Sequence, residues 1–458
     1  MKKKLLFLNL LLISICSFGQ SWVAQNTGFA SASRGLRQLH IVDANTVWGL
    51  AYDGAPSSAT DPEIQEFTRT INGGTNWTAG FIEIGQAGWT INNISAISGL
   101  VAWVSAIDLT GGAGAPTPGG IWKTVDGGIT WVRQLPTGFV GAGSFINGVY
   151  FWDANEGIAY GDPIAANKIE CYKTLNGGAT WTAIVPGPAM ISGEYNYNNG
   201  NVFNGDTVWL PTNKGFVLRS SNRGTTWTKL SGPTGITDFG GATVNASLHY
   251  SNTTNGVCLG TTDAGATYKL FSTTNGGLTW ATPAGNFAGG FNRLLSYVPG
   301  TSVLVACGAN TTPPAVPGSS FSNDNGTTFT QIDTGSQRGT VKMLTTSVGW
   351  TAGFSALTPN GTSVGGIFKL SGTLSNEIFS SSKLFSISPN PTTGLVNISC
   401  SEQFRAISIF DIAGKEIFSK NFESINQQSL ELSGFQAGAY FMKITAESKT
   451  ETIKIIKQ

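Results

Sequence analysis

The sequence predicts an all-β protein, in which a seven-bladed β-propeller over residues 20–372 precedes a small C-terminal β-sandwich. The first observation is a hairpin sequence that occurs six times, about every 50 residues, which is the length of one four-stranded propeller blade. The second is the glycine content, 60 of 458 residues, which is typical of many short strands joined by tight turns. Each repeat therefore predicts one blade of four strands, A to D.

The repeated hairpin joins strands C and D, as in "IWKTVDGGITW" at 121–131. Its Thr-x-Asp/Asn-x-Gly core supplies a side-chain oxygen that accepts hydrogen bonds from turn N–H groups, and a glycine where the backbone needs a positive φ. Four of the six copies carry Asn in place of Asp, so the turn requires the oxygen and not the charge. We expect a structural role for the six residues at this position: Asn72, Asp126, Asn176, Asn222, Asn275 and Asp324.

The seventh blade is split between the two ends of this region. Residues 341–354 and 365–372 supply strands A, B and C, but no tryptophan-bearing strand D follows them. "SWVAQNTGF" at 21–29 is similar to the D strand "TWVRQLPTGF" at 130–139. We predict that this N-terminal strand pairs with residues 367–370 and closes the ring, because an open ring would leave an unpaired strand edge.

The hairpins resemble the Asp-box, or BNR repeat, of sialidase-like propellers, with the pattern Ser/Thr-x-Asp/Asn-x-Gly-x-x-Trp/Phe. The resemblance covers residues 21–372 and implies a fold, not an activity. A true sialidase would also carry an Arg-Ile-Pro motif, which the sequence lacks. Three functions stay open: a non-catalytic propeller that binds a glycan or protein, a glycoside hydrolase or lyase, and a structural surface protein. The first is the interpretation that we favour.

Both ends of the chain predict export. Residues 1–19 combine three lysines, an apolar stretch and small residues before a cleavage point, which is typical of a signal peptide. After a linker at 373–383, residues 384–458 carry "SPNPTTG", "IFDIAGK", "LSGFQAGAYFMKI" and "KIIKQ" in that order. These motifs resemble the C-terminal sorting domain of the type IX secretion system of Bacteroidetes-type bacteria. The resemblance implies contact with that machinery, removal of the domain, and a secreted or surface-attached propeller.

The composition narrows the possible ligands. The net charge is +1 and charged residues make up 12%, so nothing favours nucleic acid, and no second apolar stretch predicts a transmembrane segment. With two histidines and no metal-ligand spacing, we expect neither a metal nor a cofactor. Four cysteines remain after the signal peptide, and scattered cysteines do not predict a disulfide framework: Cys171, Cys258, Cys307 and Cys400.

We expect ligands on the face that carries the B–C and D–A loops, opposite the repeated turns. Four aspartates end B strands on this face and are the candidates for catalysis, although Asp is also a common turn residue: Asp53, Asp108, Asp162 and Asp263. Three arginines follow D–A loops of neighbouring blades and predict a positive rim for acidic ligands: Arg37, Arg293 and Arg338. Three loop aromatics are candidates to stack on sugar rings or on protein side chains: Trp89, Tyr195 and Tyr197.

Overall fold

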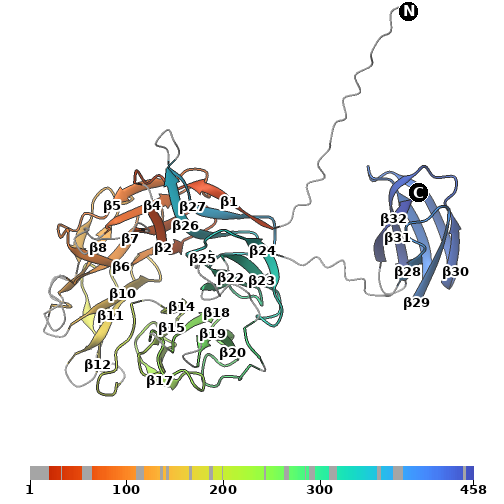
Figure 1. The fold of residues 1–458 in the computed structure, drawn as a ribbon. Coiled ribbons are helices and arrows are strands. Elements are labelled where there is room, and N and C mark those ends of the chain that lie inside the picture. The colour runs from red at the N-terminus through yellow and green to blue at the C-terminus, as the bar shows by residue number, and fades with distance from the viewer. Residues whose placement is uncertain are drawn as a thin grey trace, which may run out of the picture. The chain divides into compact units, whose positions relative to one another are not determined.

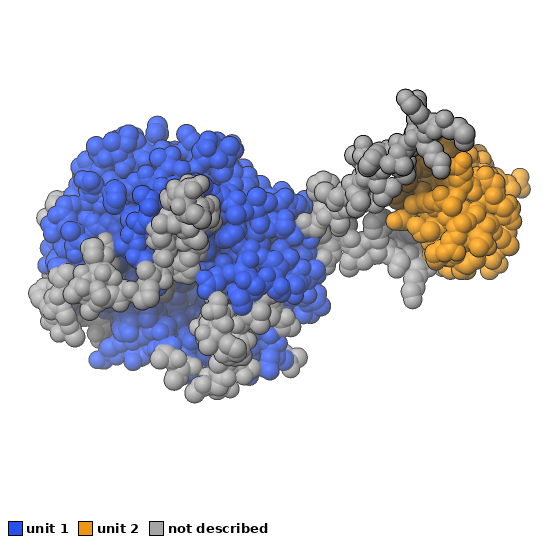
Figure 2. All heavy atoms as spheres, turned by 45° about the horizontal axis from the view of Figure 1, so that its top comes forward, with its two compact units in different colours: residues 1–374 blue, residues 375–458 orange. Residues whose placement is uncertain are grey.

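The structure is a computed structural model, and it falls into two compact units, residues 1–374 and 375–458 (Figure 2). It describes residues 20–458, apart from 32–33, 54–63, 110–117, 135–137, 141–143, 165–167, 185–188, 199, 242–243, 263–267, 284, 288–293, 309–316, 358–362, 375–384 and 447–449. None of the described residues belongs to a helix long and apolar enough to cross a membrane.

The first unit is a ring of β-sheets that succeed one another in chain order (Figure 1). Blades one to three comprise β2 (Arg34–Ile41), β3 (Val47–Asp53), β4 (Glu66–Thr70) and β5 (Thr78–Phe81); β6 (Trp89–Ala96), β7 (Ala102–Asp108), β8 (Gly119–Thr124) and β9 (Val132–Gln134); and β10 (Ile146–Phe151), β11 (Gly157–Ile164), β12 (Lys168–Thr174) and β13 (Thr182–Ala183). Each sheet is antiparallel, as the predicted A-to-D order requires.

Blades four to seven complete the ring. They comprise β14 (Val202–Asn204), β15 (Thr207–Pro211), β16 (Phe216–Ser220) and β17 (Thr228–Ser231); β18 (Ala246–Tyr250), β19 (Gly256–Thr261) and β20 (Tyr268–Thr273); β21 (Leu294–Tyr297), β22 (Leu304–Gly308), β23 (Gly318–Ser322) and β24 (Thr330–Thr334); and β25 (Thr340–Met343), β26 (Gly349–Leu357), β27 (Ser363–Ser371) and β1 (Ser21–Asn26). In blade five, a single bridge between Ser272 and Ala281 takes the place of a fourth strand. The described sheets thus form the seven blades that the sequence predicts.

The N-terminal strand closes the ring, which confirms the prediction. Strand β1 pairs antiparallel with β27 from Ser21 opposite Ser371 to Asn26 opposite Gly366. Trp22 on this strand is 9% exposed, and its Nε1 donates to Ser319 Oγ in blade six at 2.8 Å. The last blade is therefore built from both ends of the propeller sequence, and its edge strand is anchored to the preceding blade.

Each Asp-box turn is held by a repeated set of hydrogen bonds. In blade two, Thr124 Oγ1 accepts from Gly128 N at 2.8 Å, and Asp126 Oδ1 accepts from Thr130 N at 2.9 Å. The turn also reaches the A–B turn of its own blade, since Gly127 N donates to Leu100 O at 2.9 Å. The Asp-box turns and A–B turns therefore share one face of the ring. We call the opposite face, with the B–C and D–A connections, the loop face.

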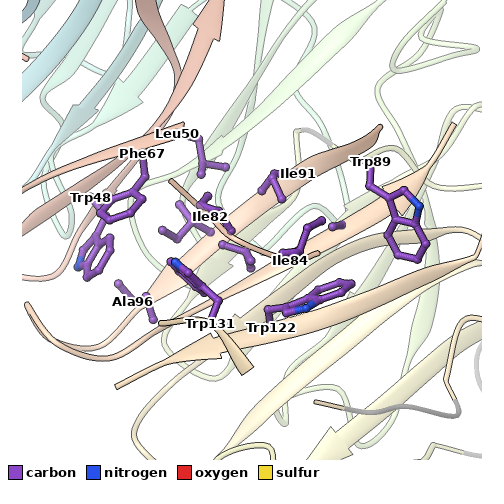
Figure 3. Packing of buried hydrophobic residues seen from close by; sticks show 14 residues of the cluster. Trp48, Leu50, Phe67, Ile82, Ile84, Trp89, Ile91, Ala96, Trp122 and Trp131 are labelled. Carbon is purple, nitrogen blue, oxygen red and sulfur yellow. The ribbon is translucent and has the colours of Figure 1, made fainter. Parts of the chain in front are cut away.

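Glycine in the box serves two purposes. Gly128 has a φ of +91°, and a Cβ at this position would lie 2.2 Å from Phe67 of the preceding blade. The Trp131 ring packs edge-on against the same Phe67 at 6.1 Å (Figure 3). Buried side chains of blades one and two thus meet in one continuous core, in which Trp48, Ile91 and Trp122 also take part.

A second repeated feature links neighbouring blades. In four blades, a tryptophan on strand B lies opposite a cation on strand C, with the charge 4.9 to 5.9 Å from the ring centroid: Trp48 with Arg69, Trp103 with Lys123, Trp209 with Arg219, and Trp350 with Lys369. Lys123 Nζ then donates to Gly177 O in the Asp-box turn of blade three at 2.9 Å. Lys369 Nζ likewise donates to Gly73 O at 2.6 Å, which links blade seven to blade one.

The second unit is a sandwich-like sheet in which two long strands bend. It contains β28 (Phe385–Ser388), β29 (Leu395–Phe410), β30 (Glu416–Glu431), β31 (Gly438–Ala446) and β32 (Thr450–Lys457). The first half of β29 pairs with β28 and its second half pairs with β31, while β30 follows both halves. The register shifts between Ser399 and Phe404, where β29 changes partners. Val396, Ile407, Met442 and Ile455 fill the core between the halves.

Candidate functional site

The loop face carries a pocket of about 280 Å³ between blades three and four. Its lining residues come from the start of β10, the end of β11 and the connection that leads from β13 to β14: Phe145, Asn147, Asp162, Tyr195, Asn196, Tyr197 and Asn198. Three of the residues that the sequence singled out, Asp162, Tyr195 and Tyr197, therefore meet at one place. Asn147 and Asn196 belong to the same pocket and were missed by the sequence analysis.

Asp162 is the carboxyl group of this pocket. Its backbone N–H donates to Phe145 O at 2.9 Å, and its Oδ1 accepts from Asn147 Nδ2 at 2.6 Å. Burial raises the pKa of Asp162 from 3.8 to about 7, while the hydrogen bond from Asn147 acts in the opposite direction. The carboxyl group therefore keeps its proton to a much higher pH than an exposed aspartate, and in its protonated form it can donate as well as accept hydrogen bonds.

Asn196 lines the pocket with an amide that is unpaired within the described part of the chain. The residue is 1% exposed, and neither its Nδ2 nor its Oδ1 has a hydrogen-bond partner there. Its backbone forms a bridge to Thr212, and the adjoining Tyr195 N donates to Asn213 Oδ1 at 2.9 Å. The loop is thus held in place by its neighbours, and the Asn196 amide does not contribute a bond to that support.

The two tyrosines of the pocket differ in their hydrogen bonding and in their exposure to solvent. Tyr197 OH donates to Asp238 Oδ1 at 2.6 Å, and burial together with this bond raises the pKa of Tyr197. Tyr195 is 41% exposed, and its ring packs edge-on against Tyr197 at 5.5 Å between centroids. The side chain of Tyr197 is therefore held in place at the edge of the pocket, whereas Tyr195 presents an aromatic surface to solvent.

The other aspartate candidates lie outside this pocket. Asp53 Oδ2 forms an ion pair with Arg34 Nη1 at 2.5 Å, and Arg34 also contacts Glu66. Asp108 is the last residue of β7 and lies opposite Trp89 in the neighbouring strand. Asp263 falls outside the described residues. Of the described aspartates at strand ends, only Asp162 is among the lining residues of this pocket.

The predicted rim of arginines is corrected by the structure. Arg338 is 2% exposed, forms an ion pair with Asp333, and lies 4.1 Å from the Phe368 ring centroid, so it is buried between blades six and seven. Arg37 donates to the Ile91 carbonyl of blade two. Arg293 lies outside the described residues. Because Arg338 is buried, it does not contribute to an accessible positive rim.

Trp89 is also a structural residue. It is 9% exposed in β6, and its ring packs edge-on against Trp122 at 5.8 Å (Figure 3). Its side chain therefore belongs to the core between blades one and two. The prediction that Trp89 offers a stacking surface to a ligand was wrong.

Two histidines on A strands lie within the electrostatic influence of Lys342, which is on a third A strand. His40 Nε2 lies 2.9 Å from Ala96 O, and His249 Nε2 lies 2.8 Å from Ser247 Oγ. Burial, with a smaller contribution from the charge of Lys342, lowers the pKa of His40 to about 4 and that of His249 to about 3. Both imidazoles are therefore neutral at physiological pH.

The described residues contain no group of three or more His, Cys, Asp or Glu that could hold a metal ion. Cys171, Cys258 and Cys307 are free thiols. Cys171, Cys258 and Cys307 are buried, and burial raises the pKa of each thiol, that of Cys307 to about 12. These three side chains are unreactive at neutral pH.

Comparison with known proteins identifies the second unit. Residues 386–458 match the family model of the secretion system C-terminal sorting domain. This domain implies export by the type IX secretion system to the cell surface or the extracellular space, and contact with its machinery. A comparison of the whole chain with curated proteins finds no match.

Several solved structures are similar to this chain at low sequence identity. YCF48 from Cyanidioschyzon merolae is 14% identical, with a TM-score of 0.46 over 77% of this chain and 98% of that one. A GH74 enzyme from Niastella koreensis is 13% identical, with a TM-score of 0.46 over 95% and 74%. Trypanosoma rangeli sialidase is 8% identical, with a TM-score of 0.41 over 95% and 88%. None of these similarities decides between binding and hydrolysis.

Proposed function

We propose that this protein is an exported β-propeller that binds an uncharged glycan on its loop face and does not cleave it. The observation that carries the proposal is the composition of the pocket. Asparagines, one partly protonated carboxyl group and aromatic rings line it, and the described lining residues include no Lys or Arg. Amides, carboxyl groups and aromatic surfaces suit a ligand with many hydroxyl groups and apolar ring faces.

A glycoside hydrolase is the second candidate, and one observation favours it. The pKa of Asp162 near 7 is suitable for a general acid at neutral pH. Hydrolysis, however, requires a second carboxyl group about 5–9.5 Å away across the scissile bond. Asp162 is the one carboxyl-bearing residue among the described residues that line the pocket, and nearby Asp238 is bonded to Tyr197. We therefore place binding ahead of catalysis.

A glycan array probed with the purified exported protein tests the proposal. We expect binding to neutral glycans and no release of reducing sugar when the bound glycans are incubated with the protein for a day. Turnover that is lost in Asp162→Asn would establish the hydrolase instead. Failure to bind any glycan, together with capture of a surface protein, would refute glycan binding.

Export is tested separately from binding. A chain that ends at residue 374 should accumulate in the periplasm, because it lacks the sorting domain at 386–458. Fusion of residues 375–458 to a reporter that carries a signal peptide should bring the reporter to the medium or the cell surface. Normal secretion of the truncated chain would contradict the role of this domain.

A further inference from the structure

The pocket contains a buried amide that the fold does not use. Asn196 lines the pocket at 1% exposure, and both polar atoms of its side chain are unpaired within the described part of the chain. A buried polar group without a partner destabilises the folded state. Neighbouring Glu194 shows the usual arrangement, since Oε1 accepts from Thr212 Oγ1 at 3.0 Å and Oε2 accepts from Ile191 N at 2.8 Å. Asn196 is therefore a candidate to pair with a ligand. Both of its polar atoms are buried in the free protein, so this pairing requires the side chains that cover them to move aside.

The chemistry of the amide restricts the kinds of ligand group that can pair with it. An asparagine side chain presents a donor and an acceptor side by side, and two adjacent hydroxyl groups, one accepting and one donating, match this pair. Asp162 adds a second polar contact, because Asn147 bonds its Oδ1 and the structure gives no described partner for its Oδ2. The exposed Tyr195 ring and the half-buried Phe145 supply apolar surface beside these groups.

We propose, building on the glycan-binding function above, that the pocket recognises one uncharged pyranose residue through two adjacent hydroxyl groups that pair with Asn196 and Asp162. The volume of about 280 Å³ is just below the range for small-molecule pockets, about 300–1,000 Å³, and suits one sugar unit better than a chain. The absence of Lys and Arg among the described lining residues disfavours sialic or uronic acids.

Calorimetric or NMR titration with methyl glycosides of glucose, galactose and mannose, and with their monodeoxy analogues, tests the proposal. For the glycoside that binds best, removal of either of two neighbouring hydroxyl groups should reduce affinity at least tenfold, and removal of a distant one should change it less than threefold. Asn196→Ala should reduce affinity about 10- to 100-fold. It should fold with unchanged or higher thermal stability, because the native amide makes no bond to the described protein.

Tyr52→Ala is the matched control, since Tyr52 is a half-exposed tyrosine in blade one at the end of strand β3, and its removal should leave affinity unchanged. Unchanged affinity in Asn196→Ala would overturn this inference and leave binding of an uncharged glycan by the propeller intact, whereas preference for an acidic sugar would overturn both. A clear loss of stability in Asn196→Ala would also overturn it, because the amide would then be structural. If no glycan binds at all, the proposed function itself fails.

Discussion

Asn147 Nδ2 donates a hydrogen bond of 2.6 Å to Asp162 Oδ1 across the loop face of blade three. The contact joins the start of strand A to the end of strand B, and it orients a carboxyl group whose pKa burial raises to about 7. The pair therefore fixes the polar side of the pocket and makes its charge sensitive to pH.

The first prediction concerns stability and pH. The pKa of Asp162 is about 7 in the folded protein and near 3.8 when unfolded, so the folded state binds more protons between these values. Its contribution to stability is therefore complete below pH 4 and is lost as the pH rises toward 7. Relative to Asp162→Asn, the wild type should lose about 2–3 kcal/mol of unfolding free energy between pH 5 and pH 8. Urea denaturation at both pH values measures this, and equal pH dependence of the two proteins would contradict it.

The two buried histidines predict that stability changes with pH in the opposite direction. Because the pKa values of His40 and His249 are lowered to about 4 and 3, their contribution to stability is present above pH 6.5 and is lost as the pH falls toward 4. A His40→Gln, His249→Gln double variant should therefore lose less stability than the wild type between pH 7 and pH 4.5. Thermal unfolding at the two pH values measures the difference. A double variant as acid-sensitive as the wild type would show that these side chains are accessible and protonate freely.

Ring closure depends on Trp22. Its indole is 9% exposed and bonded to Ser319, so Trp22→Ala should lower the unfolding free energy of the propeller by about 3–5 kcal/mol. Trp22→Phe keeps most of the apolar contact and should cost clearly less. Denaturant unfolding distinguishes the two, and a Trp22→Ala protein as stable as the wild type would show that β1 does not hold the ring closed.

The Asp-box turn is tested at Thr124. Its Oγ1 accepts from Gly128 N, and the residue is 1% exposed, so Thr124→Val leaves a buried N–H unpaired at a cost of about 1–3 kcal/mol. Thr124→Ser should be nearly neutral, because Ser220 and Ser322 make the same contact in sister blades. Asp126→Asn should also change stability little, as four sister turns carry Asn. A Thr124→Val protein with unchanged denaturation midpoint would contradict this account of the turn.

Much of the fold could be predicted because its determinants are local. The Asp-box turn is specified within about ten residues, and its period gives the number of blades. The sorting domain carries its motifs in a fixed order over residues 386–458. The links between blades were not predicted, since the contact of Lys369 with Gly73 joins residues 296 positions apart.

The candidate site was predicted only in part. The positions of strand ends and loop aromatics in the sequence predicted Asp162, Tyr195 and Tyr197. A position after a D–A loop also selected Arg338, but its partner Asp333 and its aromatic neighbours bury that side chain. Sequence spacing does not reveal which side of a blade a side chain takes. Asn196 was missed although "GEYNYNNG" alternates Tyr and Asn, a pattern that would have marked a polar and aromatic loop.

The central claim, that the pocket of blades three and four binds a neutral sugar, is tested most directly by a crystal structure of the propeller with the glycan that an array selects. The account predicts one pyranose ring beside Tyr195, with adjacent hydroxyl groups within hydrogen-bond distance of Asn196 and Asp162. A sugar bound elsewhere on the propeller, with the pocket holding only water, would contradict it.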